Sequence, residues 1–211
     1  MSFGESVSSD VQVDTREGRG ESYPSTSPIS TSEAQTRYGQ ARRLHWNHMA
    51  RLLEVRTGLG GYYHRRLSEV YQSLVSPGQS VLEIGCARGD LLAALKPARG
   101  MGVDFSEEMI RSARRRHPQL HFVHADAHAL EIDQKFDVII LSDLINDLWD
   151  LQAVLNRVSQ LTTPRSRILI NCYSRLWEPV LNIAQWLKLA TPTLYQNWLT
   201  VEDIATLLSL A

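Results

Sequence analysis

The sequence lacks the marks of several protein classes. Among 211 residues there are only two cysteines, Cys86 and Cys172. They form no CxxC pair and cannot build a disulfide framework, so we expect free thiols. No apolar run approaches the ~20 residues that a membrane-spanning helix needs, and we expect no membrane span. The first residues have neither the basic start nor the apolar core of a secretory signal, which leaves a cytoplasmic location as the default expectation.

An excess of charge of one sign is also missing. The chain has 22 Lys and Arg against 23 Asp and Glu, a formal net charge of −1. No whole-molecule field therefore attracts it to nucleic acid or to a membrane surface, and we expect neither as a partner. The arginines of Arg111–Arg116 are better explained as the last turn of a helix, where cations complement the helix dipole.

Large apolar residues are scarce over residues 1–34, which are rich in Ser, Thr, Gly, Glu and Pro. Such a segment cannot bury enough surface to offset its chain entropy, so we predict a disordered polar tail. Residues 35–78 carry two helical patterns, one ending near Gly58 and one from about Tyr62 to Leu74. Residues 79–211 follow as a single core domain, in line with the length of the chain.

Short apolar strands alternate with helical patterns from residue 79 onward. This alternation predicts an α/β fold with a doubly wound, mostly parallel sheet and helices on both faces. Ligands of such folds bind at the carboxyl ends of the strands, where the strand order reverses. The predicted strands are Val81–Ile84, Met101–Asp104, His121–His124, Phe136–Leu141 and Arg167–Cys172, and the later helices are Leu151–Leu161, Pro179–Leu187 and Val201–Leu210.

The turn after the first strand reads Glu83-Ile84-Gly85-Cys86-Ala87-Arg88-Gly89-Asp90. A glycine turn between strand and helix lets a ligand approach the backbone closely. Ala87 and Asp90 stand where the dinucleotide fingerprint GxGxxG needs its second and third glycines, and the Gly-Lys-Ser/Thr of a P-loop is absent. A second carboxylate, Asp104, ends the next strand at the ~20-residue offset at which such a group reaches a ribose hydroxyl.

This turn resembles the first motif of class I S-adenosylmethionine (SAM)-dependent methyltransferases, (D/E)xGxGxG, with Ala87 in place of the middle glycine. The segment Gly102–Met109 is similar to the family's G-x-D-x-S-x-x-M, His124–Ala127 resembles its G-D-A element, and Phe136–Ile139 resembles its F-D-x-[IV]. A tight turn and helix-capping acids explain each match singly, but not four matches in the family's order at strand ends. The resemblance covers roughly Val81 to Ser174.

The resemblance implies a Rossmann-like methyltransferase fold, SAM as the cofactor and a set of contacts to it. At Ala87 we expect ordinary backbone angles and a turn tightened by one methyl group. We expect no metal, because His121 and His124 point to opposite faces of one strand. The implied cofactor residues are Glu83, Gly85, Cys86, Ala87 and Gly89 for the methionine part, Asp104 and Phe105 for the ribose and one adenine face, Asp126 and Ala127 for the adenine edge, and Met109, His128 and Ser142 for the rest of the pocket.

The acceptor side is less defined by the sequence. Asp143 and Asp147, after the fourth strand, are the candidate catalytic residues, with helix capping as the alternative. The N/D-P-P-Y/F signature is absent here, which argues against planar amino groups of bases or glutamine. In this family such N-terminal helices often close over the cofactor, so the resemblance implies a lid at residues 35–78. Tyr63 and His64, at the start of the second of these helices, are candidate lid and substrate residues. Tyr173, after the fifth strand, is a further substrate candidate.

The resemblance is closest to the small-molecule, type 11-like group, which implies methyl transfer to an oxygen, nitrogen or carbon nucleophile of a small molecule. A fainter similarity to methyltransferase modules fused to glycosyltransferases would make the acceptor sugar- or lipid-linked. The alternative is a catalytically silent SAM-binding or partner module of a larger polypeptide. The family's sheet normally has seven strands, and no C-terminal β-hairpin is recognisable here. An exposed fifth-strand edge would then favour self-association.

Overall fold

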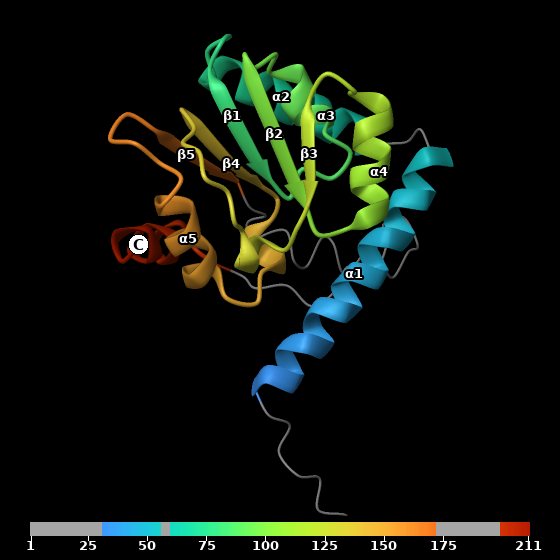
Figure 1. Cartoon of the computed structure of the whole chain (residues 1–211), viewed down its shortest axis with the longest axis vertical. Coiled ribbons are helices and arrows are strands. Elements are labelled where there is room, and N and C mark those ends of the chain that lie inside the picture. The colour runs from blue at the N-terminus through green and yellow to red at the C-terminus, as the bar shows by residue number, and fades with distance from the viewer. Residues whose placement is uncertain (1–30, 56–59, 172–198) are drawn as a thin grey trace, which may run out of the picture.

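Five parallel strands form one sheet in the computed structural model, which describes residues 31–55, 60–171 and 199–211. The order is β3-β2-β1-β4-β5, and every neighbouring pair is parallel (Figure 1). This arrangement confirms the predicted doubly wound α/β fold. The strands are β1 (Ser80–Ile84), β2 (Arg99–Asp104), β3 (His121–His124), β4 (Val138–Ser142) and β5 (Arg167–Asn171).

The central strand β1 is apolar on both faces because helices cover both sides of the sheet. Val81 packs on one side with α2 (Gly60–Leu74), α3 (Asp90–Ala94) and α4 (Glu107–Arg116). Leu82 and Ile84 pack on the other side with α5 (Leu151–Ser159) and α7 (Val201–Ser209). The two faces thus alternate residue by residue along the strand, as the pleat requires.

Side-chain caps set the starts of three helices. Ser106 accepts a hydrogen bond from the backbone N–H of Met109 at the start of α4, and Asp150 accepts one from Ala153 at the start of α5. Thr200 and Asp203 form a reciprocal capping box at the start of α7. These caps satisfy backbone donors that have no partner within the helix, and the capping box confirms the one predicted from the sequence.

The first described helix, α1 (Thr31–Val55), is longer than its sequence pattern indicated. It begins inside the segment 1–34 that the sequence assigned to a polar tail. The additional N-terminal turns consist of residues that are compatible with a helix. An exposed ion pair between Glu33 and Arg37, one turn apart, also supports them. Residues 1–30 lie outside the described part of the chain. Figure 1 shows α1 running along the edge of the sheet at which the strands end.

At the other side of the sheet, β5 is an edge strand within the described residues. It pairs with β4, and no described strand pairs with its far side. Residues 172–198, which include Cys172, Tyr173 and the helix expected at Pro179–Leu187, lie outside the description. No helix within the described ranges is both long and apolar enough to cross a bilayer.

Candidate cofactor and acceptor site

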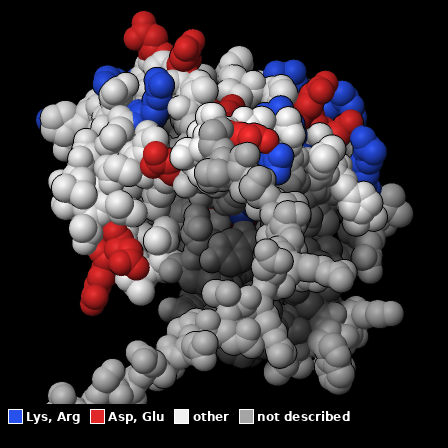
Figure 2. All heavy atoms as spheres, turned by 90° about the horizontal axis from the view of Figure 1, so that it is seen from below, with Lys and Arg blue, Asp and Glu red and all other residues white. Residues whose placement is uncertain are grey.

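The predicted site lies at the carboxyl ends of the strands. Figure 2 views the molecule from this edge, where the described surface carries acidic and basic side chains interspersed, with no broad field of one sign. Strand β1 has β2 on one side and β4 on the other, so the strand order reverses beside it. The loops after β1, β2 and β4 therefore meet at the switch point at which doubly wound sheets bind ligands.

The glycine turn after β1 lies close against the end of β2. The backbone N–H groups of Gly85 and Cys86 both donate to the carbonyl of Val103, over 2.8 and 3.0 Å. Gly89 has a φ of 73°, and a Cβ there would lie 2.5 Å from Cζ of Phe122. Only glycine fits this position, because the conformation is left-handed and no space remains for a side chain.

The backbone at Ala87 differs from the expectation. Its φ is 46°, in the left-handed region, whereas the sequence analysis expected ordinary angles. A Cβ crowds the following carbonyl oxygen in this region, at a cost of roughly 1–2 kcal/mol. The alanine thus adopts a conformation that favours glycine and is strained by it. A hydrogen bond from its N–H to Oδ2 of Asp104, over 2.9 Å, holds it in place.

The Asp104 carboxylate links the first two loops of the site. Besides accepting from Ala87, it accepts at Oδ1 from the backbone N–H of Ser106 over 2.8 Å. Burial raises the pKa of this carboxyl to about 6, and the two backbone hydrogen bonds oppose the rise. The Asp104 carboxylate is therefore held in a fixed orientation, at the position for which the sequence predicts a contact to ribose.

Glu83 supplies the second buried carboxyl of the site. Its side chain is 3% exposed, and Oε2 has no hydrogen-bond partner among the described residues. Burial raises its pKa to about 8, opposed by a hydrogen bond from the backbone of Leu92. A buried acceptor without a partner is costly unless a ligand completes it. A cationic group such as the α-ammonium of SAM would do so, and the residues present fit that cofactor.

Asp126 and His128 form a local pair after β3. His128 Nδ1 lies 2.7 Å from Oδ1 of Asp126, and the His128 backbone N–H donates to the same oxygen over 2.9 Å. The other ring nitrogen, Nε2, accepts from the backbone N–H of Asp150, so the proton lies on Nδ1. The hydrogen bond from His128 lowers the pKa of Asp126. His128 therefore orients Asp126, and both of its ring nitrogens are engaged.

Asp143 stands at the end of β4 with a φ of 53°. Its carboxylate accepts from the hydroxyl of Tyr63, over 2.9 Å to Oδ1 and 3.0 Å to Oδ2, and Asn171 donates to Oδ1 over 2.5 Å. Burial raises the pKa of Asp143, opposed first by the Tyr63 hydrogen bond. The ring of Tyr63 meets that of His64 edge-on, with the centroids 5.3 Å apart. The structure thus brings three of the sequence-derived acceptor candidates together.

Asp147, the other candidate base, faces α1 instead. Its Oδ2 accepts from the indole N–H of Trp46 over 2.9 Å, and its Oδ1 lies 3.6 Å from Nε of Arg42. Arg42 is 5% exposed and stacks over the ring of Tyr38, whose hydroxyl donates to the backbone carbonyl of Asp147. Both carboxylate oxygens are engaged by α1, so Asp147 anchors this helix to the loop after β4.

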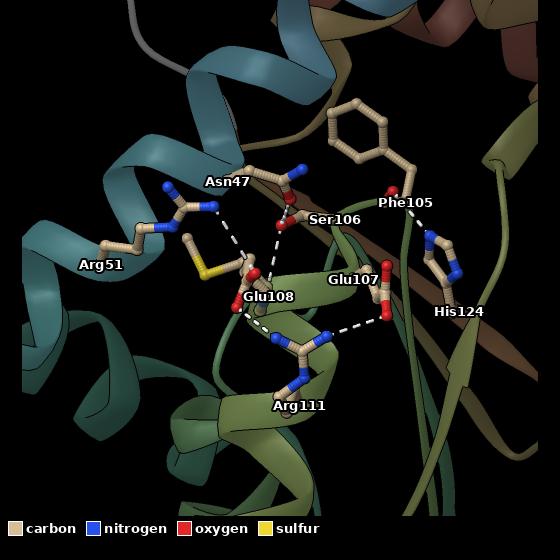
Figure 3. A network of polar contacts seen from close by, with 9 residues as sticks. Asn47, Arg51, Phe105, Ser106, Glu107, Glu108, Arg111 and His124 are labelled. Atoms are coloured by element: carbon tan, nitrogen blue, oxygen red, sulfur yellow. Dashed lines mark hydrogen bonds and ion pairs between the residues drawn. The ribbon is translucent and has the colours of Figure 1, made fainter.

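The far half of α1 contacts the loop after β2 (Figure 3). The Ser106 hydroxyl donates to Oδ1 of Asn47 over 2.6 Å, and Arg51 lies 3.7 Å from Glu108. In the same view the backbone carbonyl of Phe105 faces Nε2 of His124, 3.0 Å away, while the phenyl ring points elsewhere. Helix α1 therefore contacts both the loop after β4 and the segment that follows β2.

The remaining sequence-derived residues occupy different positions. Cys86 is buried with its Sγ against Gly102, where an added Cβ would lie 2.8 Å away, so only its backbone can line a ligand. Met109 is a buried residue of α4, and Ala127 is buried at the start of a short 3-10 turn. Ser142 is the half-buried last residue of β4 and pairs with Asn171 in the sheet. Tyr173 lies outside the described residues, within which no three His, Cys, Asp or Glu side chains are grouped to hold a metal ion.

Sequence reasoning missed several residues that the fold brings to the site. Asn171 ends an apolar strand with a polar side chain, a signal as clear as the one that singled out Asp104. Tyr71 had no comparable signal, because an aromatic residue on a helical stripe is usually part of the core. Arg42, Trp46 and Asn47 belong to a helix whose partner loops are distant in sequence.

Comparison with known proteins agrees with this geometry. A family model described as a methyltransferase domain matches residues 75–204. The chain is 30% identical over 121 residues to a protein of Mycolicibacterium smegmatis named "Probable S-adenosylmethionine-dependent methyltransferase", covering 54% of this chain and 47% of that protein. The chain spans about half the length of the curated relatives it matches.

Two solved structures share the fold at 19% identity. The PH0226 protein of Pyrococcus horikoshii aligns with a TM-score of 0.62 over 74% of this chain and 84% of that one. The N-methyltransferase NodS of Bradyrhizobium japonicum, in complex with S-adenosyl-L-homocysteine (SAH), aligns with a TM-score of 0.54 over 71% and 74%. With its strand order, glycine turn and matched domain, the chain belongs to the class I SAM-dependent methyltransferases.

Proposed function

We propose that this chain binds SAM at the ends of β1–β3 and transfers its methyl group to a small molecule bound at the ends of β4 and β5. One observation carries the proposal. Three acidic residues, Glu83, Asp104 and Asp143, lie at or next to the carboxyl ends of the neighbouring strands β1, β2 and β4, and the buried Oε2 of Glu83 has no partner among the described residues. A ligand with a cationic end and a ribose fits the first two, which leaves Asp143 for the acceptor.

In this proposal the residues hold the cofactor by its polar ends. Glu83 accepts from the α-ammonium, the turn of Gly85–Gly89 surrounds the methionine part, Asp104 accepts from the ribose hydroxyls, and Asp126 accepts from the adenine amino group. Bound SAM supplies an activated methyl group on its sulfonium. The chain itself must then supply alignment and exclusion of water, which contribute much of the rate in such transfers.

Two further elements complete the proposed mechanism. Helix α1, anchored at Asp147 and Ser106, serves as the lid that excludes water, a role expected for residues 35–78. Asp143 accepts a hydrogen bond from the nucleophile and takes its proton where the acceptor must lose one. Its position next to the hydroxyl of Tyr63 suits an acceptor that carries O–H or N–H groups.

The acceptor is proposed to be a small molecule with an oxygen, nitrogen or carbon nucleophile, with sugar- or lipid-linked compounds among the candidates. The name of NodS, an N-methyltransferase, supports nitrogen as one of these nucleophiles. The absence of the N/D-P-P-Y/F signature argues against the planar amino groups of bases or glutamine. The proposal also includes self-association through β5, whose far edge has no partner strand among the described residues.

A second candidate function is a catalytically silent SAM-binding module. The observation that favours it is that the carboxylates of both candidate catalytic residues, Asp143 and Asp147, are already engaged by side chains of this chain. Calorimetry with SAM and SAH, followed by incubation with labelled SAM and a panel of sugars, lipids and amines, separates the two. Binding with transfer of label to an acceptor supports the enzyme. Binding without transfer to any acceptor supports the silent module, and a folded sample that binds neither compound contradicts both.

A further inference from the structure

A chain of hydrogen bonds runs from the interior of α2 to Asp143. The hydroxyl of Tyr71 donates to the side-chain oxygen of Asn171 over 2.7 Å, and the side-chain nitrogen of Asn171 donates to Oδ1 of Asp143 over 2.5 Å. Because the amide nitrogen faces a carboxylate, which can only accept, a flip of the Asn171 side chain would place two acceptors against each other and lose the bond to Asp143. Tyr71 therefore fixes Asn171, and Asn171 fixes one oxygen of Asp143.

This series of hydrogen bonds does more than join two strands. The backbone N–H of Asp143 already donates to the carbonyl of Asn171 over 3.2 Å, and Ser142 pairs with Asn171 in the sheet register. The side-chain bonds add nothing that the ladder needs. They hold a carboxylate whose backbone lies in the left-handed region, at φ 53°. Strained residues kept in place by their surroundings cluster at functional sites.

The two oxygens of Asp143 have different surroundings. Asn171 fastens Oδ1 from a half-buried position on β5. The Tyr63 hydroxyl also contacts Oδ1, but at Oδ2 it is the sole hydrogen-bond donor among the described residues, and Tyr63 is 36% exposed on α2. A hydroxyl or amine of an entering molecule can replace the Tyr63 contact at Oδ2 while Asn171 keeps Oδ1 in place. Oδ1 is thus held by Asn171, whereas the contact at Oδ2 can be exchanged for one to an entering molecule.

We propose that Asn171, held in its rotamer by Tyr71, is a positioning residue that fixes the Asp143 carboxylate toward the acceptor. The assignment rests on the proposed function for the identity of the acceptor side, but the positioning itself is a property of the chain alone. The hydrogen bond from Asn171 also affects the pKa of Asp143. Burial favours its protonated form, while hydrogen bonds from Tyr63 and Asn171 and the nearby His64 favour the carboxylate.

Tyr71 lies on α2, as do Tyr63 and His64. Besides burial, the charges of Asp143 and of Glu83 on β1 raise the pKa of Tyr71. Burial raises the pKa of Tyr71 well above its ordinary value, so its hydroxyl remains protonated and remains a donor to Asn171. The titratable groups around Asp143 are therefore Tyr63, His64 and Tyr71 of α2, with Glu83 acting through Tyr71. Asn171 contacts Asp143 and is not titratable, so its substitution changes the hydrogen bonding and no charge.

The test is a carbon-13 NMR titration of the Asp143 carboxyl in the full chain, with the signal assigned through Asp143→Asn. Asn171→Ala should raise the pKa of Asp143 by about one unit, because the carboxylate loses a donor. Tyr71→Phe should raise it by less, since Asn171 keeps its nitrogen but loses its anchor. Tyr62→Phe is the control, because Tyr62 is exposed on the same helix; it should leave the titration unchanged.

An unchanged titration in both Asn171→Ala and Tyr71→Phe would overturn the proposal. If Asn171→Ala does not fold, Tyr71→Phe decides alone, because it removes one oxygen atom and keeps the ring. Calorimetry with SAH is run on the same samples. Equal SAH affinity in Tyr71→Phe and the parent chain supports a role on the acceptor side. A parent chain that fails to bind SAH refutes the proposed function, while the titration still decides the positioning role.

Discussion

The backbone N–H of Ala87 donates to Oδ2 of Asp104 from a left-handed conformation, with φ at 46°. A glycine would adopt this angle without strain, so the hydrogen bond to Asp104 keeps an alanine where the geometry favours glycine. The turn and the ribose-side carboxylate are therefore one structural unit, in which a change on either side affects the other.

Ala87→Gly should consequently stabilise the chain by about 1 kcal/mol, because the relief of strain exceeds the added entropy of the unfolded chain. The free energy of unfolding from urea denaturation measures this. Ala153→Gly, in the ordinary helix α5, is the matched control and should destabilise the chain by about 1 kcal/mol. Destabilisation by Ala87→Gly of the same size as the control would show that no strain is stored there.

Glu83 should make the stability of the chain without cofactor fall with rising pH. Its pKa in the folded chain is about 8, above the ordinary value of 4.5, so the folded state binds the proton more tightly than the unfolded state does. The stabilisation is fully present below pH 4.5 and is lost as the pH rises through about 8. Glu83→Gln should flatten this decline, measured as the free energy of unfolding at a series of pH values.

Asp104→Asn provides the comparison for that experiment. The pKa of Asp104 is raised to about 6 from 3.8, so its contribution is lost at lower pH than that of Glu83. The two variants should therefore flatten different parts of the curve. A Glu83→Gln profile that runs parallel to the parent over the whole range would mean that Glu83 is ionised in the folded chain already.

Asp104→Ala should weaken the binding of SAH by about 1–3 kcal/mol, because ribose hydroxyls lose their acceptor and the turn loses its bond to Ala87. Isothermal calorimetry gives the affinity directly. Asp137→Ala is the control, because this carboxyl lies at the opposite end of the sheet, where it accepts from Ser80. Equal SAH affinity in Asp104→Ala and Asp137→Ala would remove Asp104 from the cofactor site.

Asp147→Asn should loosen α1 from the loop after β4. The change leaves the buried Arg42 guanidinium without its carboxylate, and breaking a buried charge pair is costly. Hydrogen exchange of the α1 amides should accelerate at least tenfold, roughly the effect of 1.4 kcal/mol. Arg37→Ala removes an exposed ion pair of the same helix and should change the exchange far less. Similar exchange in both variants would argue that Asp147 does not anchor α1.

The edge of β5 should promote self-association of the 211-residue chain. Its residues Ile168–Ile170 are apolar, and its far edge, with which no described strand pairs, offers backbone donors and acceptors to a second copy. Light scattering over a range of concentrations should show an average mass that rises with concentration. A stable monomer throughout that range would mean that the edge is protected.

The sequence by itself determined the strands, the fold and the edge of the sheet at which the residues predicted for the cofactor lie. Local patterns carry that information: apolar runs form strands, Ser106 and Asp150 start helices, and the carboxyl ends of parallel strands bring Glu83, Asp104 and Asp126 to one edge. Only the tertiary structure decided the rest. Asp143 and Asp147 look alike in sequence, but one meets Tyr63 and Asn171 while the other is held by Arg42 and Trp46. Packing between segments far apart in the chain makes that difference, and no local pattern encodes it.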